Sequence, residues 1–412
     1  MKLSTTRDAL RQLKAQPRAL RIAAAFYLLH ILVQGKIAPL EISAFLTILF
    51  LGWAIGRGEV RPSFHILYFP LILYGIASSV SALINWPSMH PLADAMTWFK
   101  MLIFPAALIL FRSVPGLKSL ALRAQIIFAV VLSLIAVGQY LALPQATLET
   151  RVTGTLSHVM TLSGMLLAVG LLLVVLAAHW QRWWLIASAA VVTFALFLTY
   201  TRSVWLGWIV AVSILLILER PRWIPLVAAA ALVFVTFMPM SFFSRLVSSF
   251  DVEQSSNLDR IRMAQGGIEM IKDFPVAGVG PAYVKEVYPL YRKADAPRFR
   301  TPHLHNNVIQ LWAERGILGI IAYATLIILF LRECARQWNG DRREFAQAGL
   351  ALAVGLAVAG LFEFNFGDTE VFYLMLSLMA LVVAFLESPA SPPNEPAPAV
   401  VAAGPGPAVA GP

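Results

Sequence analysis

Several arginine and histidine side chains lie where an apolar segment begins, at positions where a charged group meets either lipid headgroups or a ligand. Arg202 lies in the short connection between two apolar segments, in the sequence TYTRSVWLG. A free helix N-terminus attracts anions, and an arginine there adds a planar fork that matches phosphate oxygens. Arg202 is therefore a candidate phosphate ligand, and an arginine that extends to headgroups is the alternative.

A second pair of arginines, Arg260 and Arg262, lies in the longest polar segment of the chain. Two residues that are two positions apart on a helix diverge by about 200°, so only one of the pair can face a given site. Asp259 and Asp273 are available as partners for the arginine that faces solvent. One arginine is thus a candidate site residue, and a wholly solvated loop helix is the alternative.

Two histidines, His303 and His305, precede the apolar segment that begins near residue 307. A neutral imidazole accepts a proton near neutral pH, so His305 is a candidate general base. On a continuous helix, Gly316 and Gly319 would lie within about 40° of His305 around the helix axis. Such a stripe of small residues would let another helix pack closely beneath the histidine. A hydrogen-bonded interfacial histidine without a chemical role is the alternative.

A metal site is the competing interpretation of the two histidines. Their spacing differs from the i, i+4 spacing of a helical metal pair, and no nearby carboxylate or cysteine clearly completes a set. Glu363, Asp368 and Glu370 form an acidic cluster in a later connection and could bind a divalent cation. The single cysteine excludes an intrachain disulfide and a multi-cysteine metal site. We therefore expect no metal at this site.

The elements that position these residues are predicted to be membrane-spanning helices. Of 412 residues, 59% are hydrophobic and 13% are charged, against roughly a quarter charged in soluble domains. The apolar residues fall in blocks of about 15–25, the length that crosses a bilayer as a helix. We expect an all-α polytopic membrane protein with about 12 transmembrane helices and one long extracytoplasmic loop containing short helices. The expected spans are 21–35, 38–56, 64–84, 97–112, 120–142, 158–178, 183–200, 203–219, 223–239, 307–331, 345–362 and 370–387.

Charge asymmetry orients these spans. The N-terminal segment and the loops on its side carry 18 Lys and Arg residues, whereas the opposite short loops carry three, with one more just inside the fourth span. By the positive-inside rule, both ends are cytoplasmic and the segment 240–306 is extracytoplasmic. The net charge of +10 is explained in this way, without a nucleic-acid partner. The basic residues before the first span indicate an uncleaved signal anchor.

This orientation divides the chain into five parts. They are a cytoplasmic N-terminal segment, 1–20; transmembrane helices 1–9, 21–239; the extracytoplasmic loop, 240–306; transmembrane helices 10–12, 307–387; and a disordered cytoplasmic tail, 388–412. The tail is rich in Pro, Ala and Gly and cannot pack a core. Within the loop, a helix is expected from about Leu258 to Lys272.

Four short motifs resemble those of a known family. In chain order they are RVTGTLSH from Arg151 to His158, RSVWL from Arg202 to Leu206, Arg260 ahead of PVAGVG from Pro275 to Gly280, and His305-Asn306 followed by Gly316 and Gly319. Together they resemble the bacterial O-antigen ligases and the wider O-antigen ligase/polymerase superfamily. The tryptophan that usually lies four residues after the loop arginine is Ala264 here, which leaves the register between Arg260 and Arg262 open.

The resemblance implies a multi-pass glycosyltransferase of the bacterial cell inner membrane, active on the periplasmic side in lipopolysaccharide biosynthesis. Its donor would be an undecaprenyl-diphosphate-linked O-antigen and its acceptor lipid A–core. Membrane lipids surround it, and no nucleic acid, cofactor or metal takes part. Arg202 and Arg260 would bind the diphosphate, and His305 would be the catalytic base. A direct displacement inverts the anomeric centre.

Three alternatives remain open. An O-antigen or capsule polymerase uses the same donor with a different acceptor. A protein O-oligosaccharyltransferase does so too, but usually has additional sequence after the last span. A transporter has the same topology, but places charged residues near the middle of the membrane, whereas here most spans lack charges.

Overall fold

The computed structural model describes residues 5–87, 96–142, 151–236, 240–248, 251 and 254–388. Within these residues the regular structure is helical and no strand is present, which confirms the predicted all-α class. The expected tail, 388–412, lies outside the described residues apart from Ser388.

Each predicted span falls on a helix. In chain order these are α2 (Arg18–Leu32), α3 (Ile37–Gly56), α4 (Tyr68–Ile84), η1 (Met96–Leu102) with α6 (Ile103–Ser113), α7 (Leu117–Ala142), α8 (Val159–Trp180), α9 (Trp183–Leu198), α10 (Arg202–Glu219), α11 (Ile224–Thr236), α15 (Asn307–Arg336), α16 (Arg343–Ala359) and α17 (Thr369–Leu386). A short turn, η2 (Pro221–Trp223), precedes α11. Among the described helices, α3, α7, α8, α10, α15 and α17 are long and apolar enough to cross a bilayer.

The centre of the bundle is formed by α8 and α17. Their apolar stretches are 89% and 94% buried, against 33% for α3 and α10. The outer helices instead expose large apolar side chains, including Phe45 and Leu49 on α3. An apolar outer face around an apolar core is expected of helices that contact lipid.

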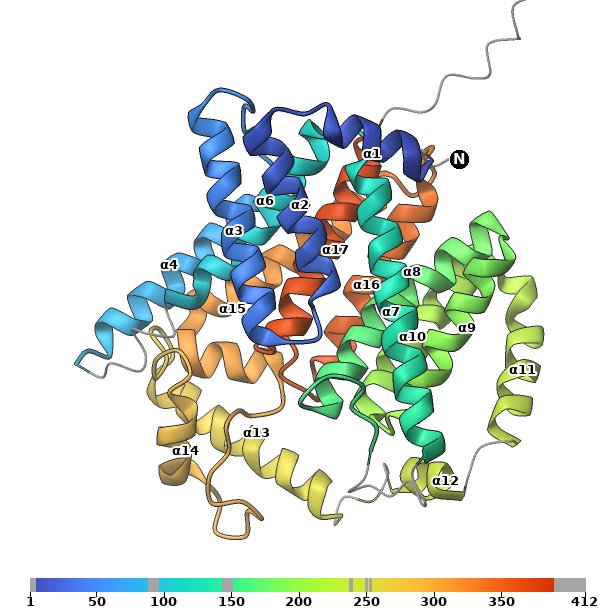
Figure 1. Cartoon of the computed structure of the whole chain (residues 1–412). Helices are drawn as coiled ribbons and strands as arrows, with labels where there is room; N and C mark the ends of the chain where they lie inside the picture. Colours follow the sequence, from blue (N-terminus) through green and yellow to red (C-terminus); the bar gives the residue numbers. More distant parts are fainter. Residues whose placement is uncertain are drawn as a thin grey trace, which may run out of the picture.

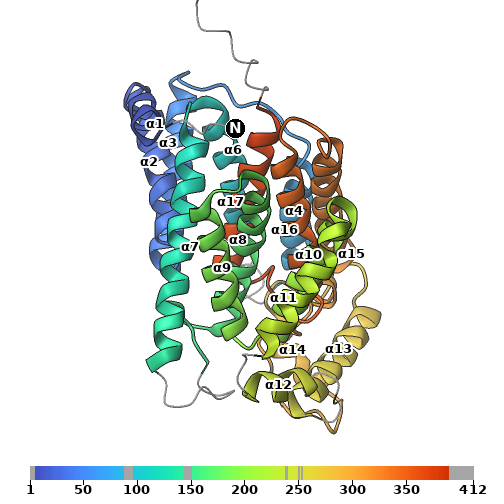
Figure 2. The same cartoon turned by 90° about the vertical axis from the view of Figure 1, so that its right-hand side faces the viewer.

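The two ends of the bundle differ. The short helix α1 (Thr6–Lys14), which the sequence analysis did not predict, lies at one end; α12 (Met240–Val247), α13 (Ser255–Asp273) and α14 (Val284–Tyr291) lie at the other (Figure 1 and Figure 2). The helix expected within the long segment is thus present as α13. A separate hydrophobic cluster joins α13 and α14 to the start of α15, formed by Met263, Met270, Val279, Val284, Tyr288, Leu304 and Ala313.

The predicted stripe of Gly316 and Gly319 beneath His305 is wrong. It requires a continuous helix, but α15 is interrupted at Gly316, which has φ 65° and ψ −163°. A positive φ of this kind is readily adopted only by glycine. The break turns the start of α15 relative to the rest of the helix, so the helical period does not carry through it.

The segment 275–280 fills the break. Val279 donates its backbone N–H to the carbonyl of Ala313 (2.8 Å), which lies in the last turn before the break. A Cβ on Gly316 would lie 1.8 Å from the carbonyl oxygen of Val276, so this segment packs directly against the glycine. The glycine therefore accommodates a loop, not a neighbouring helix, and the loop satisfies backbone groups that the break leaves free.

Candidate functional site

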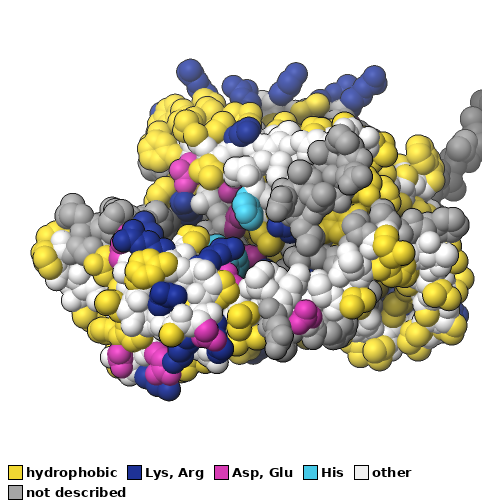
Figure 3. Space-filling model, turned by 90° about the horizontal axis from the view of Figure 1, so that it is seen from below, with side chains coloured by type: hydrophobic (Ala, Val, Ile, Leu, Met, Phe, Trp, Pro, Cys, Tyr) yellow, Lys and Arg dark blue, Asp and Glu magenta, His cyan; other side chains and the backbone are white. Residues whose placement is uncertain are grey.

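His305, Glu363 and Arg260 meet at the end of the bundle that carries α13. The Nδ1 atom of His305 lies 3.0 Å from both carboxylate oxygens of Glu363, and Arg260 Nη2 lies 3.6 Å from Glu363 Oε2. The three side chains come from the segment before α15, the connection between α16 and α17, and α13. Figure 3 shows this end hollowed at its centre, with histidine, acidic and basic side chains around the hollow.

Two asparagines fix the segments that carry this histidine and this glutamate. Asn306 donates through Nδ2 to the carbonyl of Leu361 (2.8 Å), and its Oδ1 caps α15. Asn307 donates through Nδ2 to Oδ1 of Asn365 (2.6 Å). These bonds hold the start of α15 against the α16–α17 connection, and so set the distance between the groups on either side.

The Glu363 carboxylate is ionised. Burial raises the pKa of this group, but the hydrogen bond from His305 and the charges of His305, His303 and Arg260 outweigh burial and lower the pKa to about 2. The carboxylate therefore accepts the Nδ1–H of His305. In the neutral tautomer that carries its proton on Nδ1, the lone pair lies on Nε2, which is the form that a general base requires.

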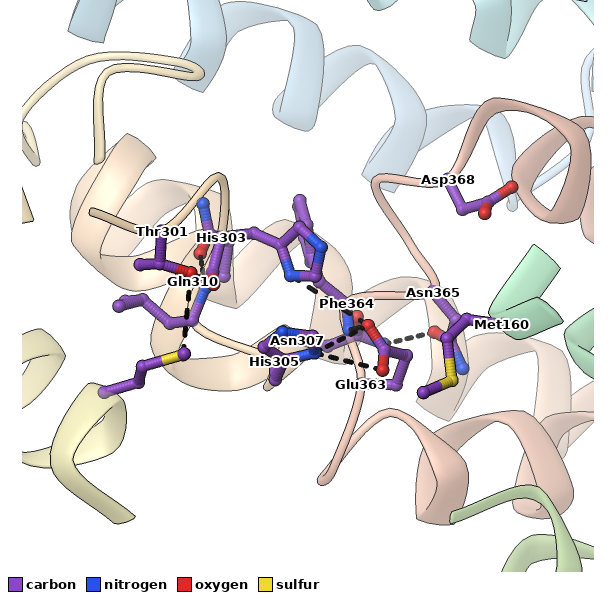
Figure 4. Close-up of polar contacts among 12 residues, drawn as sticks. Met160, Thr301, His303, His305, Asn307, Gln310, Glu363, Phe364, Asn365 and Asp368 are labelled. Carbon is purple, nitrogen blue, oxygen red and sulfur yellow. Dashed lines mark hydrogen bonds and ion pairs between the residues drawn. The ribbon is translucent and has the colours of Figure 1, made fainter. Parts of the chain in front are cut away.

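His303 lies in the same site, which the sequence did not predict. Its ring centroid is 4.3 Å from that of His305, and its Nδ1 is 3.9 Å from Glu363 Oε1. Figure 4 shows both rings turned toward the carboxylate. Burial, with the charge of His305, lowers the pKa of His303 to about 4, so the ring is neutral at neutral pH. His303, His305 and Glu363 offer ligand atoms within 4.8 Å of one another, a set that could hold a metal ion.

Glu363 and Asp368 of the predicted acidic cluster line the same cavity but have different hydrogen-bond partners. Asp368 caps α17 by accepting from the backbone N–H of Val371 (3.1 Å), and Thr161 donates to its other oxygen (2.5 Å). Figure 4 shows Asp368 apart from the histidines, whereas Glu363 faces them. Asp368 thus stabilises a helix end, and Glu363 belongs to the histidines.

Arg260 and Arg262 point to different partners. Arg262 forms an ion pair with Asp295 and donates to Gln265 (2.8 Å), while Arg260 faces Glu363. The expectation that Asp259 or Asp273 pairs with the solvent-facing arginine is wrong. Asp259 pairs with Arg298 and Asp273 accepts from the hydroxyl of Tyr291, because the chain folds back beyond α14 and brings other partners nearer.

Arg202 links α10 to the start of α13. It donates to the carbonyl of Ser248 (2.9 Å), to Asn257 Oδ1 (2.5 Å) and to Ser256 Oγ (3.2 Å). Its hydrogen-bond partners among the described residues are all neutral. It therefore positions the helix that carries Arg260 and also adds positive charge beside it.

Arg151 is a site residue that the sequence analysis quoted only as part of a motif. Its Nη1 is buried and has no hydrogen-bond partner among the residues that the structure describes. Burial, together with the charge of Arg260, lowers the pKa of Arg151, and the charge of Glu363 opposes this. The usable signal was a lone arginine in the connection between two apolar spans.

A comparison with protein families gives one match. Residues 187–324 match the family model described as O-antigen ligase. This part of the chain is therefore similar to the O-antigen ligase superfamily. The matched region contains Arg202, Arg260 and His305, whereas Arg151 and Glu363 lie outside it. A search of curated proteins finds no match.

The family match and the apolar helices together support a multi-pass membrane transferase that uses lipid-linked glycans. A cavity of about 620 Å³ adjoins the site and is lined by His305 and Glu363, with Tyr74, Lys100, His158 and Phe364 among its other residues. In the described part of the chain, Arg151, Arg202 and Arg260 do not line it. His305 and Glu363 thus lie between the cavity and the arginines.

Proposed function

We propose that the protein is an O-antigen ligase that transfers a glycan from undecaprenyl diphosphate to lipid A–core, on the periplasmic face of the bacterial inner membrane. The observation that supports this most directly is the His305–Glu363 pair beside the cationic group of Arg151, Arg202 and Arg260. A base next to an anion site is what a hydroxyl acceptor and a diphosphate leaving group require.

The arginines serve the donor. The diphosphate is already ionised when it leaves, so it needs charge stabilisation rather than a proton. Arg202 and Arg260 supply charge-assisted hydrogen bonds to the diphosphate oxygens. Arg151 adds an Nη1 nearby that has no hydrogen-bond partner in the described part of the chain. Each charge-assisted bond contributes roughly 1.5–3 kcal/mol. With this positive charge in place, the reaction proceeds without a metal ion.

The histidine serves the acceptor. A sugar hydroxyl in the adjoining cavity gives its proton to His305 Nε2 as its oxygen attacks the anomeric carbon. The bond from that carbon to the diphosphate oxygen breaks, and its electron pair leaves with the diphosphate. Attack opposite the leaving group inverts the anomeric centre. Glu363 orients the imidazole and stabilises the imidazolium that forms, as the carboxylate does in a Ser-His-Asp triad.

The proposed topology has about 12 spans, with both ends cytoplasmic and the segment 240–306 periplasmic. Its support is the helix at each predicted span and the position of α12 to α14 opposite α1. In this arrangement the cavity and the arginines face the periplasm, where the proposed transfer takes place.

Deletion of the gene in its host tests the ligase against the polymerase. Gel analysis of lipopolysaccharide is the measurement. A ligase mutant loses the whole O-antigen ladder and accumulates the lipid-linked glycan. Capping of the core by a single repeat would instead identify a polymerase, because ligation would then be intact. Complementation with His305→Ala should reproduce the deletion phenotype.

A further inference from the structure

We propose that His303, His305 and Glu363 form a binding site for a borderline divalent cation such as Zn²⁺, and that a cation bound there blocks transfer. Binding of the cation follows from the geometry alone. Its inhibitory effect rests on the proposed function, because the cation would bind both the proposed base and the carboxylate that orients it.

The donor set suits this class of cation. Imidazole nitrogens and a carboxylate are the usual ligands of Zn²⁺, with bonds of about 2.0–2.2 Å. Two such ligands on a tetrahedral ion lie about 3.3 Å apart. The Nδ1 atoms of His305 and His303 lie 3.0 Å and 3.9 Å from Glu363 Oε1. All three ligand atoms lie within 4.8 Å of one another, so rotation of the two imidazole rings, with atomic shifts of up to about 1.5 Å, would bring them to this spacing.

The backbone places both histidines on one side of their segment. Residues 301–306 are not helical, so the i, i+4 spacing of helical metal pairs does not apply to them. Leu304 is 1% exposed and packs into the cluster between α13 and α15. The residues on either side of it, His303 and His305, consequently face the opposite direction, toward Glu363 (Figure 4).

A buried nitrogen of His303, Nδ1, has no hydrogen-bond partner among the described residues. A buried polar atom left without a partner costs about 1–3 kcal/mol. A cation bound between this nitrogen and Glu363 would give the nitrogen a partner. The proposed transfer reaction, by contrast, assigns no role to His303.

The cavity provides access and the arginines limit affinity. All three ligands line the cavity of about 620 Å³, so an ion reaches them from solvent without opening the fold. Three protein ligands leave one position for water. Arg260, at 3.6 Å from Glu363 Oε2, repels a cation. We therefore expect weaker binding than in a four-ligand structural zinc site.

The experiment titrates Co²⁺, as a coloured substitute for Zn²⁺, into metal-stripped full-length protein in detergent. We expect the visible absorption of a tetrahedral nitrogen–oxygen site, abolished by added Zn²⁺. His303→Ala, His305→Gln and Glu363→Gln should each weaken binding at least about tenfold. His179→Ala is the matched control, because this histidine bonds to Gln347 in another part of the bundle. Thermal unfolding of each variant verifies that it is folded.

The outcomes separate the two proposals. Equal Co²⁺ binding by the wild type and all three ligand variants would overturn the site and leave the transferase proposal untouched. Binding without inhibition of transfer by Zn²⁺ would overturn the blocking effect alone. Inhibition by Zn²⁺ that EDTA reverses supports both parts. Transfer abolished by EDTA and restored by Zn²⁺ would make the ion a cofactor and overturn the inhibitory role.

Discussion

At the scale of single residues, the hydrogen bond between His305 and Glu363 determines which ring nitrogen is free. Both carboxylate oxygens lie 3.0 Å from Nδ1, so Nε2 is the nitrogen left for an acceptor hydroxyl. With its pKa lowered to about 2, the Glu363 carboxylate remains a hydrogen-bond acceptor across the physiological pH range. An ionised partner also stabilises the imidazolium formed during transfer.

Replacing Glu363 by glutamine tests this orienting role. Glutamine keeps the shape but loses the charge, and its amide can hold the ring in the wrong tautomer. We expect kcat to fall about 10- to 10³-fold, with the donor KM changing less. Steady-state kinetics on reconstituted protein measure both constants. A variant with wild-type kcat would show that His305 works without the carboxylate.

The two histidines should differ in their effect on transfer. His305→Ala is expected to lower the rate by about 10²–10⁴-fold, the usual contribution of a general base, while donor binding persists. His303→Ala should retain substantial activity, because no proton transfer is assigned to it. The measurement is transfer from lipid-linked donor to core acceptor in proteoliposomes, alongside donor binding. Loss of donor binding by His305→Ala as complete as that of Arg202→Ala would make His305 a diphosphate ligand instead.

Arg262 is the control for the predictions on Arg202 and Arg260. Arg260→Ala and Arg202→Ala are each expected to cost about ten- to a hundredfold in rate, from the loss of bonds worth roughly 1.5–3 kcal/mol. Arg262→Ala should be mild, because this residue pairs with Asp295 away from Glu363. Lysine at 260 should rescue only in part, since it lacks the fork. A severe Arg262→Ala with a mild Arg260→Ala would reverse the assignment.

Part of this site could be predicted from the sequence. The helical period separates Arg260 from Arg262, and a motif selects His305 from its neighbours. Glu363 could not be assigned in this way, because its bond to His305 joins residues 58 positions apart. Local sequence instead associated it with Asp368, which caps a helix. Contacts between distant segments depend on how the helices pack, and no local pattern encodes that.

At the scale of elements, the break in α15 is the feature on which the site most depends. The segment 275–280 enters the break and supports the first turns of the helix that follow His305. Length and hydropathy predicted α15 well, since both follow from the membrane. They could not predict the break, because a glycine in an apolar helix has the same local pattern whether or not a loop packs against it.

Gly316→Ala tests the break. A non-glycine residue at φ 65° costs of order 1–3 kcal/mol, and the added Cβ would meet the Val276 carbonyl oxygen at 1.8 Å. We expect thermal unfolding in detergent at a clearly lower temperature, with reduced transfer. Gly52→Ala in α3 is the control, because a Cβ there has no neighbour within 4 Å and alanine favours a helix. Equal unfolding temperatures would show that α15 tolerates closure of the break.

At the scale of the whole molecule, the bundle has one end with a short basic helix and one with the candidate site. Arg11 and Lys14 lie in the last turn of α1, while α12 to α14 cover the opposite end (Figure 1). The count of loop charges predicts that the N-terminal segment and the segment 240–306 lie on opposite sides of the membrane. The packing order of the helices was not predictable in this way, since nearly all of them are apolar throughout.

Cysteine labelling tests the orientation of the two ends. Cys334 is buried and is first replaced by alanine. Ala294→Cys, exposed after α14, and Ala15→Cys, exposed after α1, then report one end each. A membrane-impermeant maleimide, applied to cells with a permeable outer membrane, should label Ala294→Cys but not Ala15→Cys. Opening the inner membrane should make both react. The reverse pattern would place His305 and the arginines in the cytoplasm, where the proposed donor glycan is not presented, and the ligase mechanism would fail with it.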